Sequence, residues 1–478
     1  NLKAVCGVLL RALFNLSANK TNNALLMQTE AFGLSVECIQ QYLEEEQIVD
    51  MATGFIDNML NADCANLEVF KAKDGVRTEL NALSKHPAHL SICLHVLNAL
   101  CAVTRTNDFM RIVKVASCSV SIYDVLKHQF GQSEIFAACT VLLEQLVNEP
   151  SQLAPILRVN NIRDMMVMVP RLRKRPGDAC KLLTLILVLL SASSAEMIGE
   201  INMESFFTEL VIYAHELPVQ TKAVAFLLKA CADKAICAKF AEEGCIPLLV
   251  RVMEKHPESA ALCEEVLKTL AFTLVDDAAI AAFATNNGIA TTIATMKRFQ
   301  ESVEVAYRGY FVLWTACHTQ DYCAVALEKG GADVLQYTYG HYMEEERIIG
   351  CCIGFCHQMV LYPVIASALA TTACLQLVFA VVKRYAKTED IMDHCVIILT
   401  KMLAADLAVS AVVEADVLGV IVGAMRASEE ESPLRESVCL FLVYLLHDEQ
   451  ARNVLIRLDL TSFLIGVLQS SEKWSLLS

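Results

Sequence analysis

Apolar residues recur every three or four positions through most of this chain, a spacing that places them on one face of an α-helix. Clear examples are residues 262–274 and 436–445, where Leu, Val, Ala and Cys follow this period. Short breaks at glycine or proline separate the apolar runs, because neither residue continues a helix well. The pattern therefore predicts an all-α protein.

A small or turn-forming residue ahead of an apolar helix recurs about every 42 residues along the whole chain. These anchors are Gly33, Gly75, Cys118, Asn161, Met203, Gly244, Gly288, Gly331, Ala373, Asp416 and Asp459. Five prolines follow an anchor by about 12 to 17 residues, where proline breaks a helix. They are Pro87, Pro176, Pro218, Pro257 and Pro433. Each unit is therefore predicted to contain a short helix, a turn, a second helix, a loop and a long third helix.

Three helices in about 42 residues cannot bury an apolar third helix by themselves, so each unit must stack on its neighbours. The unbroken spacing predicts one continuous right-handed α-solenoid over residues 1–478, without an internal domain boundary. We expect about ten complete three-helix repeats and a partial repeat at each end. Because the chain begins at Asn1 inside an amphipathic pattern, we interpret it as part of a longer polypeptide.

Two segments resemble the armadillo-repeat family. Residues 244–250, Gly-Cys-Ile-Pro-Leu-Leu-Val, are similar to that family's glycine–Ile–Pro–Leu entry to the second helix. Residues 9–17, Leu-Leu-Arg-Ala-Leu-Phe-Asn-Leu-Ser, are similar to its third-helix signature. The likeness covers the whole chain. It implies an armadillo-type solenoid whose third helices line a concave groove, in which extended or helical segments of partner proteins bind.

The resemblance also implies a function class. We expect a non-enzymatic scaffold without a cofactor, resident in the cytoplasm as a subunit of a large cytoskeletal or ciliary assembly. Two alternatives stay open: a nuclear-transport-type cargo adaptor, and a substrate-recruiting arm of a larger enzyme. Import adaptors of this family carry a Trp and, four residues later, an Asn on successive third helices. Here Trp314 and Trp474 are followed by His318 and Ser478, so this ladder is missing.

The composition narrows the possibilities further. The chain is 55% hydrophobic and 19% charged, with 18 Gly and 10 Pro among 478 residues, which is too apolar for a disordered protein and too poor in turn residues for a β-rich one. A net charge of −15 repels phosphate backbones, so we expect no nucleic-acid partner. The 20 Cys lie mostly within apolar helical runs, as reduced thiols. Residues 358–382 are uncharged and long enough to span a membrane, but Pro363 and a repeat junction favour a buried stretch of solenoid.

The groove candidates come from the third helices. Residues nearest to the family's Asn position are Asn15, Asn58, Gln145, Thr273, Thr315, Gln358, Lys401 and Tyr444. The helix 303–318 also carries Tyr307, Tyr310, Phe311 and Trp314, and one helix cannot turn all four rings to the same side. Some of these rings must be core, and Phe311 and Trp314 are the strongest groove candidates, because aromatic residues anchor interfaces. The predicted partner-binding set is Phe311, Trp314, Thr315, Gln358, Lys401 and Tyr444.

Charged loops recur in the same phase of the repeat. Three acidic triplets, residues 44–46, 344–346 and 429–431, should form a solvated ridge along one edge. Against them stands one basic cluster between Pro170 and Pro176. It consists of Arg171, Arg173, Lys174 and Arg175. This cluster could bind an acidic segment such as a tubulin tail, serve as a nuclear-import signal, or be a solvated loop without a function.

No motif for catalysis is found: the sequence has no glycine-rich phosphate loop and no His-Glu-x-x-His. The densest group of metal-ligand residue types is Cys351, Cys352, Cys356 and His357. On a helix, His357 points about 100° away from Cys356, and no second half of a zinc site follows. We therefore expect these residues to be core, and we predict neither a metal nor an enzymatic activity.

Overall fold

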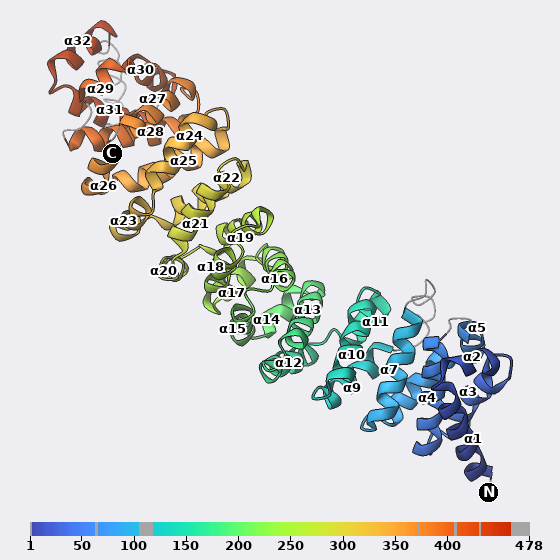
Figure 1. Cartoon of the computed structure of the whole chain (residues 1–478). Helices are drawn as coiled ribbons and strands as arrows, with labels where there is room; N and C mark the ends of the chain where they lie inside the picture. The colour runs from blue at the N-terminus through green and yellow to red at the C-terminus, as the bar shows by residue number, and fades with distance from the viewer. Residues whose placement is uncertain are drawn as a thin grey trace. The chain divides into compact units, whose positions relative to one another are not determined.

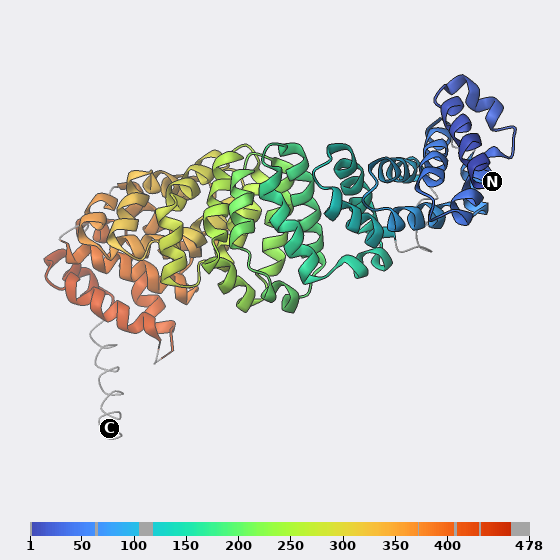
Figure 2. The same ribbon diagram turned by 90° about the horizontal axis from the view of Figure 1, so that it is seen from below.

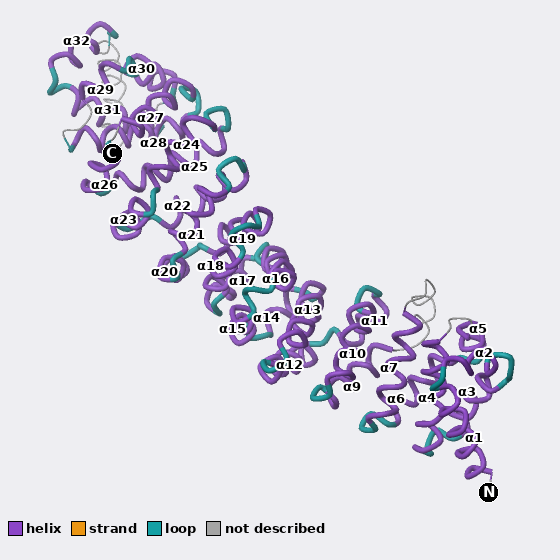
Figure 3. The backbone as a smooth tube through the Cα atoms, viewed as in Figure 1, coloured by secondary structure: helices purple, strands orange, loops and turns teal. Residues whose placement is uncertain are grey.

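The computed structural model describes residues 2–62, 66–104, 118–370, 372–405, 409–429 and 432–459. Throughout these ranges the chain consists of helices joined by short turns, and no strand is present in them (Figure 3). The chain divides into two compact units, residues 1–230 (unit 1) and 231–478 (unit 2). Each is described by itself.

Unit 1 begins with a long helix and continues with successive repeats of up to three helices (Figure 1). Its helices are α1 (Leu2–Ser17), α2 (Lys20–Leu26), α3 (Ala31–Gln41), α4 (Glu46–Ala62), α5 (Asn66–Ala72), α6 (Gly75–Lys85), α7 (Leu90–Thr104), α9 (Cys118–Gln129), α10 (Ser133–Leu146), α11 (Pro150–Ile156), α12 (Val159–Met168), the 3-10 turn η1 (Val169–Leu172), α13 (Pro176–Ala192), α14 (Ala195–Glu200), α15 (Glu204–Ile212) and α16 (Leu217–Ala230). The third helices are α1, α4, α7, α10, α13 and α16.

Unit 2 repeats the same order of short, second and third helix. Its helices are α17 (Lys234–Glu242), α18 (Cys245–Lys255), α19 (Ala260–Thr273), α20 (Asp277–Thr285), α21 (Gly288–Arg298), α22 (Val303–Ala316), α23 (Gln320–Glu328), α24 (Gly331–His341), α25 (Glu346–Val360), α26 (Pro363–Leu369), α27 (Thr372–Arg384), α28 (Glu389–Ala404), α29 (Val409–Glu414), α30 (Leu418–Ala427), α31 (Pro433–Leu445) and α32 (Glu449–Arg457). The third helices are α19, α22, α25, α28 and α31.

The turn between the first and second helix explains part of the recurring anchors. Six residues in the described ranges have a positive φ. Five of them lie at this turn, Asp74, Gly244, Asn287, Gly330 and Asp416, and Asp459 follows the first helix α32. Glycine adopts this left-handed conformation without a steric penalty, and Asn and Asp tolerate it better than other residues. The next residue often packs tightly: a side chain on Gly288 would begin 2.3 Å from the ring of Phe283. Six of the eleven anchors, Gly75, Gly244, Gly288, Gly331, Asp416 and Asp459, therefore lie at or directly after such a residue, whereas Gly33, Asn161 and Ala373 lie inside the second helix.

The third helices form the core of each unit. Neighbouring third helices contact one another, as α4 contacts α7 in unit 1 and α28 contacts α31 in unit 2. Phe55 and Phe136 in unit 1, and Tyr310, Phe355 and Phe441 in unit 2, are fully buried. Figure 2 shows the resulting stack of helices within each unit. The prediction of an all-α solenoid built from stacked three-helix repeats is confirmed, and the prediction of one array without an internal boundary stays a prediction.

The uncharged stretch of residues 358–382 does not form one helix. It is divided among α25, α26 and α27. No single described helix is long and apolar enough to cross a membrane; only Pro363–Leu369 and Cys374–Arg384 taken together pass on composition, with an 84° bend between them. Among the acidic triplets, Glu44 pairs with Lys85 of the next repeat, as Glu344 does with Arg384. Such exposed pairs each contribute at most about 1 kcal/mol.

Candidate protein-binding groove

The third helices line a concave face in each unit. Stacked helices lie about 8–10 Å apart, so side chains two repeats apart cannot meet across a flat or convex face. In unit 1, Lys222 Nζ on α16 nevertheless lies 3.4 Å from Glu144 Oε1 on α10, across the intervening α13. In unit 2, the rings of Trp314 on α22 and His394 on α28 lie 5.7 Å apart, edge to face, across α25. The middle helix must therefore be recessed, as in a groove.

A glycine in the middle helix makes this contact possible in unit 2. A Cβ atom at Gly354 of α25 would lie 2.6 Å from two atoms of the Trp314 ring, which is too close for any residue other than glycine. Because glycine leaves this space free, the indole lies over α25 and reaches His394. Phe311 contacts the same indole edge to face, with ring centroids 6.5 Å apart. Trp314 and Phe311 are both partly exposed, so they form an aromatic floor that solvent reaches.

Two histidines continue this floor. The Nδ1 atoms of His357 on α25 and His394 on α28 lie 2.8 Å apart, so one ring donates a hydrogen bond to the other. Burial, and then the neighbouring His394, lower the pKa of His357 to about 4. Burial also lowers the pKa of His394, against the opposing charges of Asp393 and Asp390. Both imidazoles are therefore neutral at pH 7.

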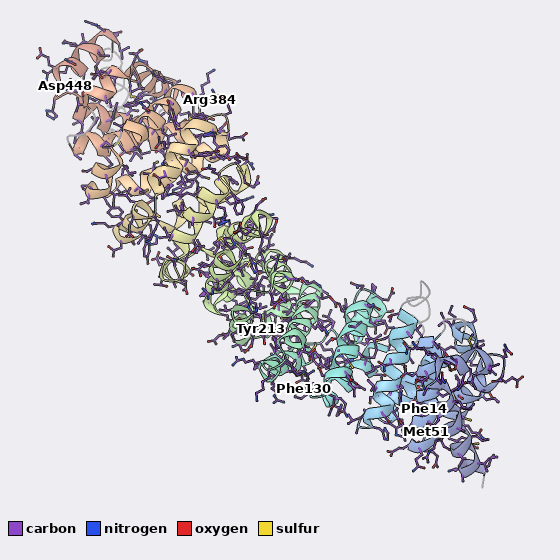
Figure 4. The ribbon with its side chains drawn as sticks, viewed as in Figure 1. Phe14, Met51, Phe130, Tyr213, Arg384 and Asp448 are labelled. Carbon is purple, nitrogen blue, oxygen red and sulfur yellow. The ribbon has the colours of Figure 1, made fainter. Side chains whose placement is uncertain are left out.

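Unit 1 repeats this arrangement with one change. Phe14 on α1 lies over Gly54 of α4, where a side chain would begin 2.6 Å from its ring. Its ring meets that of His95 on α7 at 5.5 Å, edge to face, and Phe14 is labelled in Figure 4. In the place of His357 stands Asp57, whose Oδ2 lies 3.2 Å from His95 Nδ1. The aromatic–glycine–histidine series is thus common to both units, and the polar partner of the histidine differs.

All six residues of the predicted partner-binding set lie on third helices of unit 2. Thr315 is held locally, because its hydroxyl donates to the Phe311 carbonyl at 3.0 Å. Gln358 is partly exposed and Lys401 is exposed. Tyr444 on α31 is 39% exposed. The structure brings Phe311 and Trp314 together, whereas the other four residues follow one another along successive helices. Trp474 lies outside the described residues.

Two residues that shape the aromatic floor were not predicted from the sequence: Gly354, which leaves room for the Trp314 ring, and His394, which contacts that ring. A glycine inside a long apolar helix, about 40 residues after an aromatic and about 40 before a histidine, was the available signal. It occurs twice, in the third helices of both units. The prediction that part of the aromatic helix is core is borne out by Tyr310, which is fully buried.

The basic cluster is largely engaged within the chain. Arg173 pairs with Glu209 of the next repeat, and the Arg171 guanidinium lies 5.8 Å from the centre of the Phe130 ring. Arg175 donates to Asp178 at 2.6 Å and to the carbonyl oxygens of residues 130 and 131. Lys174 is exposed. The side chains are therefore not four equivalent free cations, and binding of an acidic partner here stays a prediction.

Charge reversal at two members of this cluster should have unequal effects. We expect Arg175→Glu to lower the free energy of unfolding by about 1.5 kcal/mol, because it removes bonds to two carbonyls and places a carboxylate beside Asp178. Lys174→Glu, at an exposed position, should change it by less than about 0.5 kcal/mol. Chemical denaturation of the two variants measures the difference. Equal stabilities would show that the Arg175 contacts do not hold this turn.

The cysteines near His357 belong to the core. Cys351, Cys352 and Cys356 are buried on α25, and burial raises the pKa of the Cys351 thiol to about 11. Within the described ranges, no group of three or more His, Cys, Asp or Glu is arranged to hold a metal ion. His357 faces His394 rather than these thiols. We therefore assign the cysteines to packing.

A separate cavity of about 500 Å³ lies between α21, α22 and α24. Its walls include Tyr337, whose ring stacks on His341 with centroids 3.9 Å apart. Lys297 and Asp333 also line it and form an ion pair at 2.6 Å. The rings and charges of this cavity are thus engaged with one another, and we assign no function to it.

Comparison with known proteins supports the fold. No family model matches the chain, and no curated protein matches it. A chain from a solved structure concerned with a phosphorylation switch in the interaction between cadherin and beta-catenin is similar over 91% of this chain and 87% of its own length, with a TM-score of 0.54 and 14% identity. The crystal structure of an engineered protein covers 87% of this chain and 99% of its own, with a TM-score of 0.48 and 13% identity. The first likeness shows the fold, an all-α solenoid.

Proposed function

We propose that this protein is a non-enzymatic scaffold whose unit 2 groove binds an extended segment of a partner protein, with Trp314 as the main anchor. The observation that supports the proposal most is the position of the indole. It lies on Gly354 at the concave face, partly exposed, where a bound segment would cover it. Large aromatic side chains in such positions contribute most of the binding energy of many interfaces.

Apolar side chains extend this surface along unit 2. Phe272 on α19 is 45% exposed, and Val443 on α31 is 56% exposed. Both lie close to the repeat position of Trp314, and Tyr444 follows Val443 directly. An extended segment that runs along the third helices would cover these side chains in turn.

The finer parts of the proposal rest on the resemblance to the armadillo family. It supports family membership, the absence of catalysis, and residence in a cytoplasmic assembly of several subunits, with a cytoskeletal or ciliary setting. The missing Trp and Asn ladder weighs against the alternative of a nuclear-transport adaptor. Reciprocal affinity purification with crosslinking mass spectrometry tests the setting, because crosslinked lysines identify both the partner and the face that it covers.

A peptide selection tests the groove directly. The whole chain is screened at pH 7.4 against a random linear peptide library, and the dissociation constants of the selected peptides are measured for Trp314→Ala. We expect a loss of about 2 kcal/mol, or about thirtyfold in affinity, which is typical of an aromatic anchor. Trp314→Phe should retain most of the affinity, because it keeps a ring over Gly354.

The control is Tyr339→Ala, which removes an exposed aromatic from the second helix α24, away from the groove. It should leave the affinity unchanged. Melting temperatures of all three variants separate binding from stability. If Trp314→Ala lowers the melting temperature strongly and every selected peptide binds it as well as the native chain, the indole is packing and the binding surface lies elsewhere.

A further inference from the structure

The side of α22 that faces the groove continues beyond the aromatic floor. After the first residue of the helix, the residues that are not buried recur every three or four positions: Glu304, Tyr307, Arg308, Phe311, Trp314 and Thr315. Residues with this spacing lie on one side of a helix. Because Trp314 reaches His394 from this side, across α25, the whole stripe faces the groove.

Two arginines and a glutamate meet around a tyrosine ring in this stripe. The guanidinium carbon of Arg308 lies 4.7 Å from the centre of the Tyr307 ring, and that of Arg347, on the next third helix α25, lies 4.8 Å from it. Arg347 Nη2 donates to Glu304 Oε1 at 3.0 Å. The other carboxylate oxygen, Oε2, lies 3.6 Å from Arg308 Nε. We call these four residues the arginine cluster.

The arginine cluster has more positive than negative charge. One carboxylate stands between two guanidinium groups, and Glu345 acts on Arg347 more weakly than Glu304 does. Arg308 Nε is buried and has no hydrogen-bond partner in the described part of the chain. The side chain of Arg347 is 54% exposed and that of Arg308 is 26% exposed. The cluster therefore keeps positive charge and guanidinium surface that solvent reaches.

The guanidinium groups are also held in place before a partner arrives. Contact with the Tyr307 ring attracts each cation to the π-face, and the two oxygens of Glu304 fix one cation relative to the other. Ordering a long arginine side chain costs conformational entropy on binding, and most of that cost is already met here. An arginine pair of this kind is suited to a planar anion, because a guanidinium donates two parallel N–H···O bonds to a carboxylate.

Resting on the proposed function, we propose that Arg308 and Arg347 bind a carboxylate side chain, an Asp or a Glu, of the partner segment that covers Trp314. The helical rise places Arg308 about 9 Å from Trp314 along α22, so side chains of one segment reach both. The incoming carboxylate balances the second guanidinium charge. A lysine or arginine of the partner at this point would meet two like charges, so the cluster also selects against basic segments.

The peptides selected on the whole chain test this site. Those that lose affinity for Trp314→Ala should share an Asp or a Glu at a fixed distance from their anchor residue. Changing that residue to Asn or Gln keeps its shape and removes its charge, and should lower the affinity about tenfold. Arg347→Gln should cause a similar loss. The two changes together should cost little more than either alone, because they remove the same interaction.

Arg384→Gln is the matched control. Arg384, labelled in Figure 4, is 45% exposed and pairs with Glu344 of the preceding repeat. It lies on the second helix α27 rather than in the groove, so its replacement should leave the affinity unchanged. Melting temperatures of Arg347→Gln and Arg384→Gln should both stay close to that of the native chain, because exposed ion pairs contribute little to stability.

The outcomes separate the two proposals. Peptides that depend on Trp314, but bind equally well with their carboxylates changed to amides, overturn the carboxylate site and leave the groove function standing. The site is also overturned if the losses from the amide peptide and from Arg347→Gln simply add, since the carboxylate then binds elsewhere. Peptides that depend on Arg347 and not on Trp314 support the carboxylate site and overturn the indole anchor. If no selected peptide depends on either residue, both proposals are wrong.

Discussion

Replacing Phe355 by alanine should lower the free energy of unfolding by about 4 kcal/mol, the largest effect that we expect from a single substitution here. Phe355 on α25 is fully buried. Its ring lies 6.2 Å from that of Tyr310 on α22, and it packs close to Gly331 at the start of α24. The truncation would leave a cavity where three helices of two repeats meet, and stacked repeats relax poorly around such a void.

Chemical denaturation of Phe355→Ala and of Leu361→Ala measures this effect. Leu361 follows α25 and is 39% exposed, so its truncation should have a small effect. Phe55, at the corresponding position of α4 in unit 1, is also fully buried and should behave as Phe355 does. A loss below about 1 kcal/mol at both phenylalanines would contradict the assignment of the third helices as the core of each unit.

A buried carboxyl group in unit 1 should make stability depend on pH. Glu79 on α6 is fully buried, and neither carboxyl oxygen finds a hydrogen-bond partner within the described ranges. Burial, and then the charge of Asp57, raise the pKa of Glu79 well above its ordinary value of 4.5. The folded chain therefore keeps a proton that the unfolded chain releases above pH 4.5. The free energy of unfolding should fall as the pH rises from 4.5 toward the raised pKa.

Glu79→Gln isolates this contribution, because glutamine has nearly the same shape and no proton to lose. At pH 9 we expect the variant to be more stable than the native chain by about 3 kcal/mol, the scale of an uncompensated buried charge. Near pH 4 the two stabilities should converge. Glu68→Gln, at an exposed position of α5, serves as the control and should leave the pH dependence unchanged. If the native chain and Glu79→Gln lose stability in parallel as the pH rises, Glu79 is ionised in the folded state.

The repeat could be predicted because its signals are local. A left-handed turn residue such as Gly244 or Asp416, a proline after the second helix and a long apolar run each restrict a few neighbouring dihedral angles. Their regular recurrence then implied stacking, since no single unit can bury its own third helix. The predicted groove residues followed from the same phase; Phe311 and Trp314 lie on the third helix α22 with their rings in contact, and their role in binding stays a prediction.

The side chains that are exposed in the groove could not be predicted, because their positions depend on contacts between repeats. Trp314 is an anchor candidate because Gly354, 40 residues away, leaves room for its ring, and because His394 meets that ring from the far side. The sequence offered His357 only as a poor metal ligand beside Cys356, since the distance to His394 is not visible along the chain. Likewise, the cations of Arg173 and Arg175 looked free until the structure brought carboxylates to them.

The sequence by itself therefore determined the helices, their turns and their order, because these depend on backbone preferences and apolar periodicity within about 42 residues. Only the tertiary structure decided which side chains are neutral, paired or exposed in the groove. Those properties depend on burial and on distances between residues of different repeats. A hydrogen bond such as that between His357 and His394 joins side chains that a repeat pattern places on neighbouring helices, and only packing fixes the distance between them.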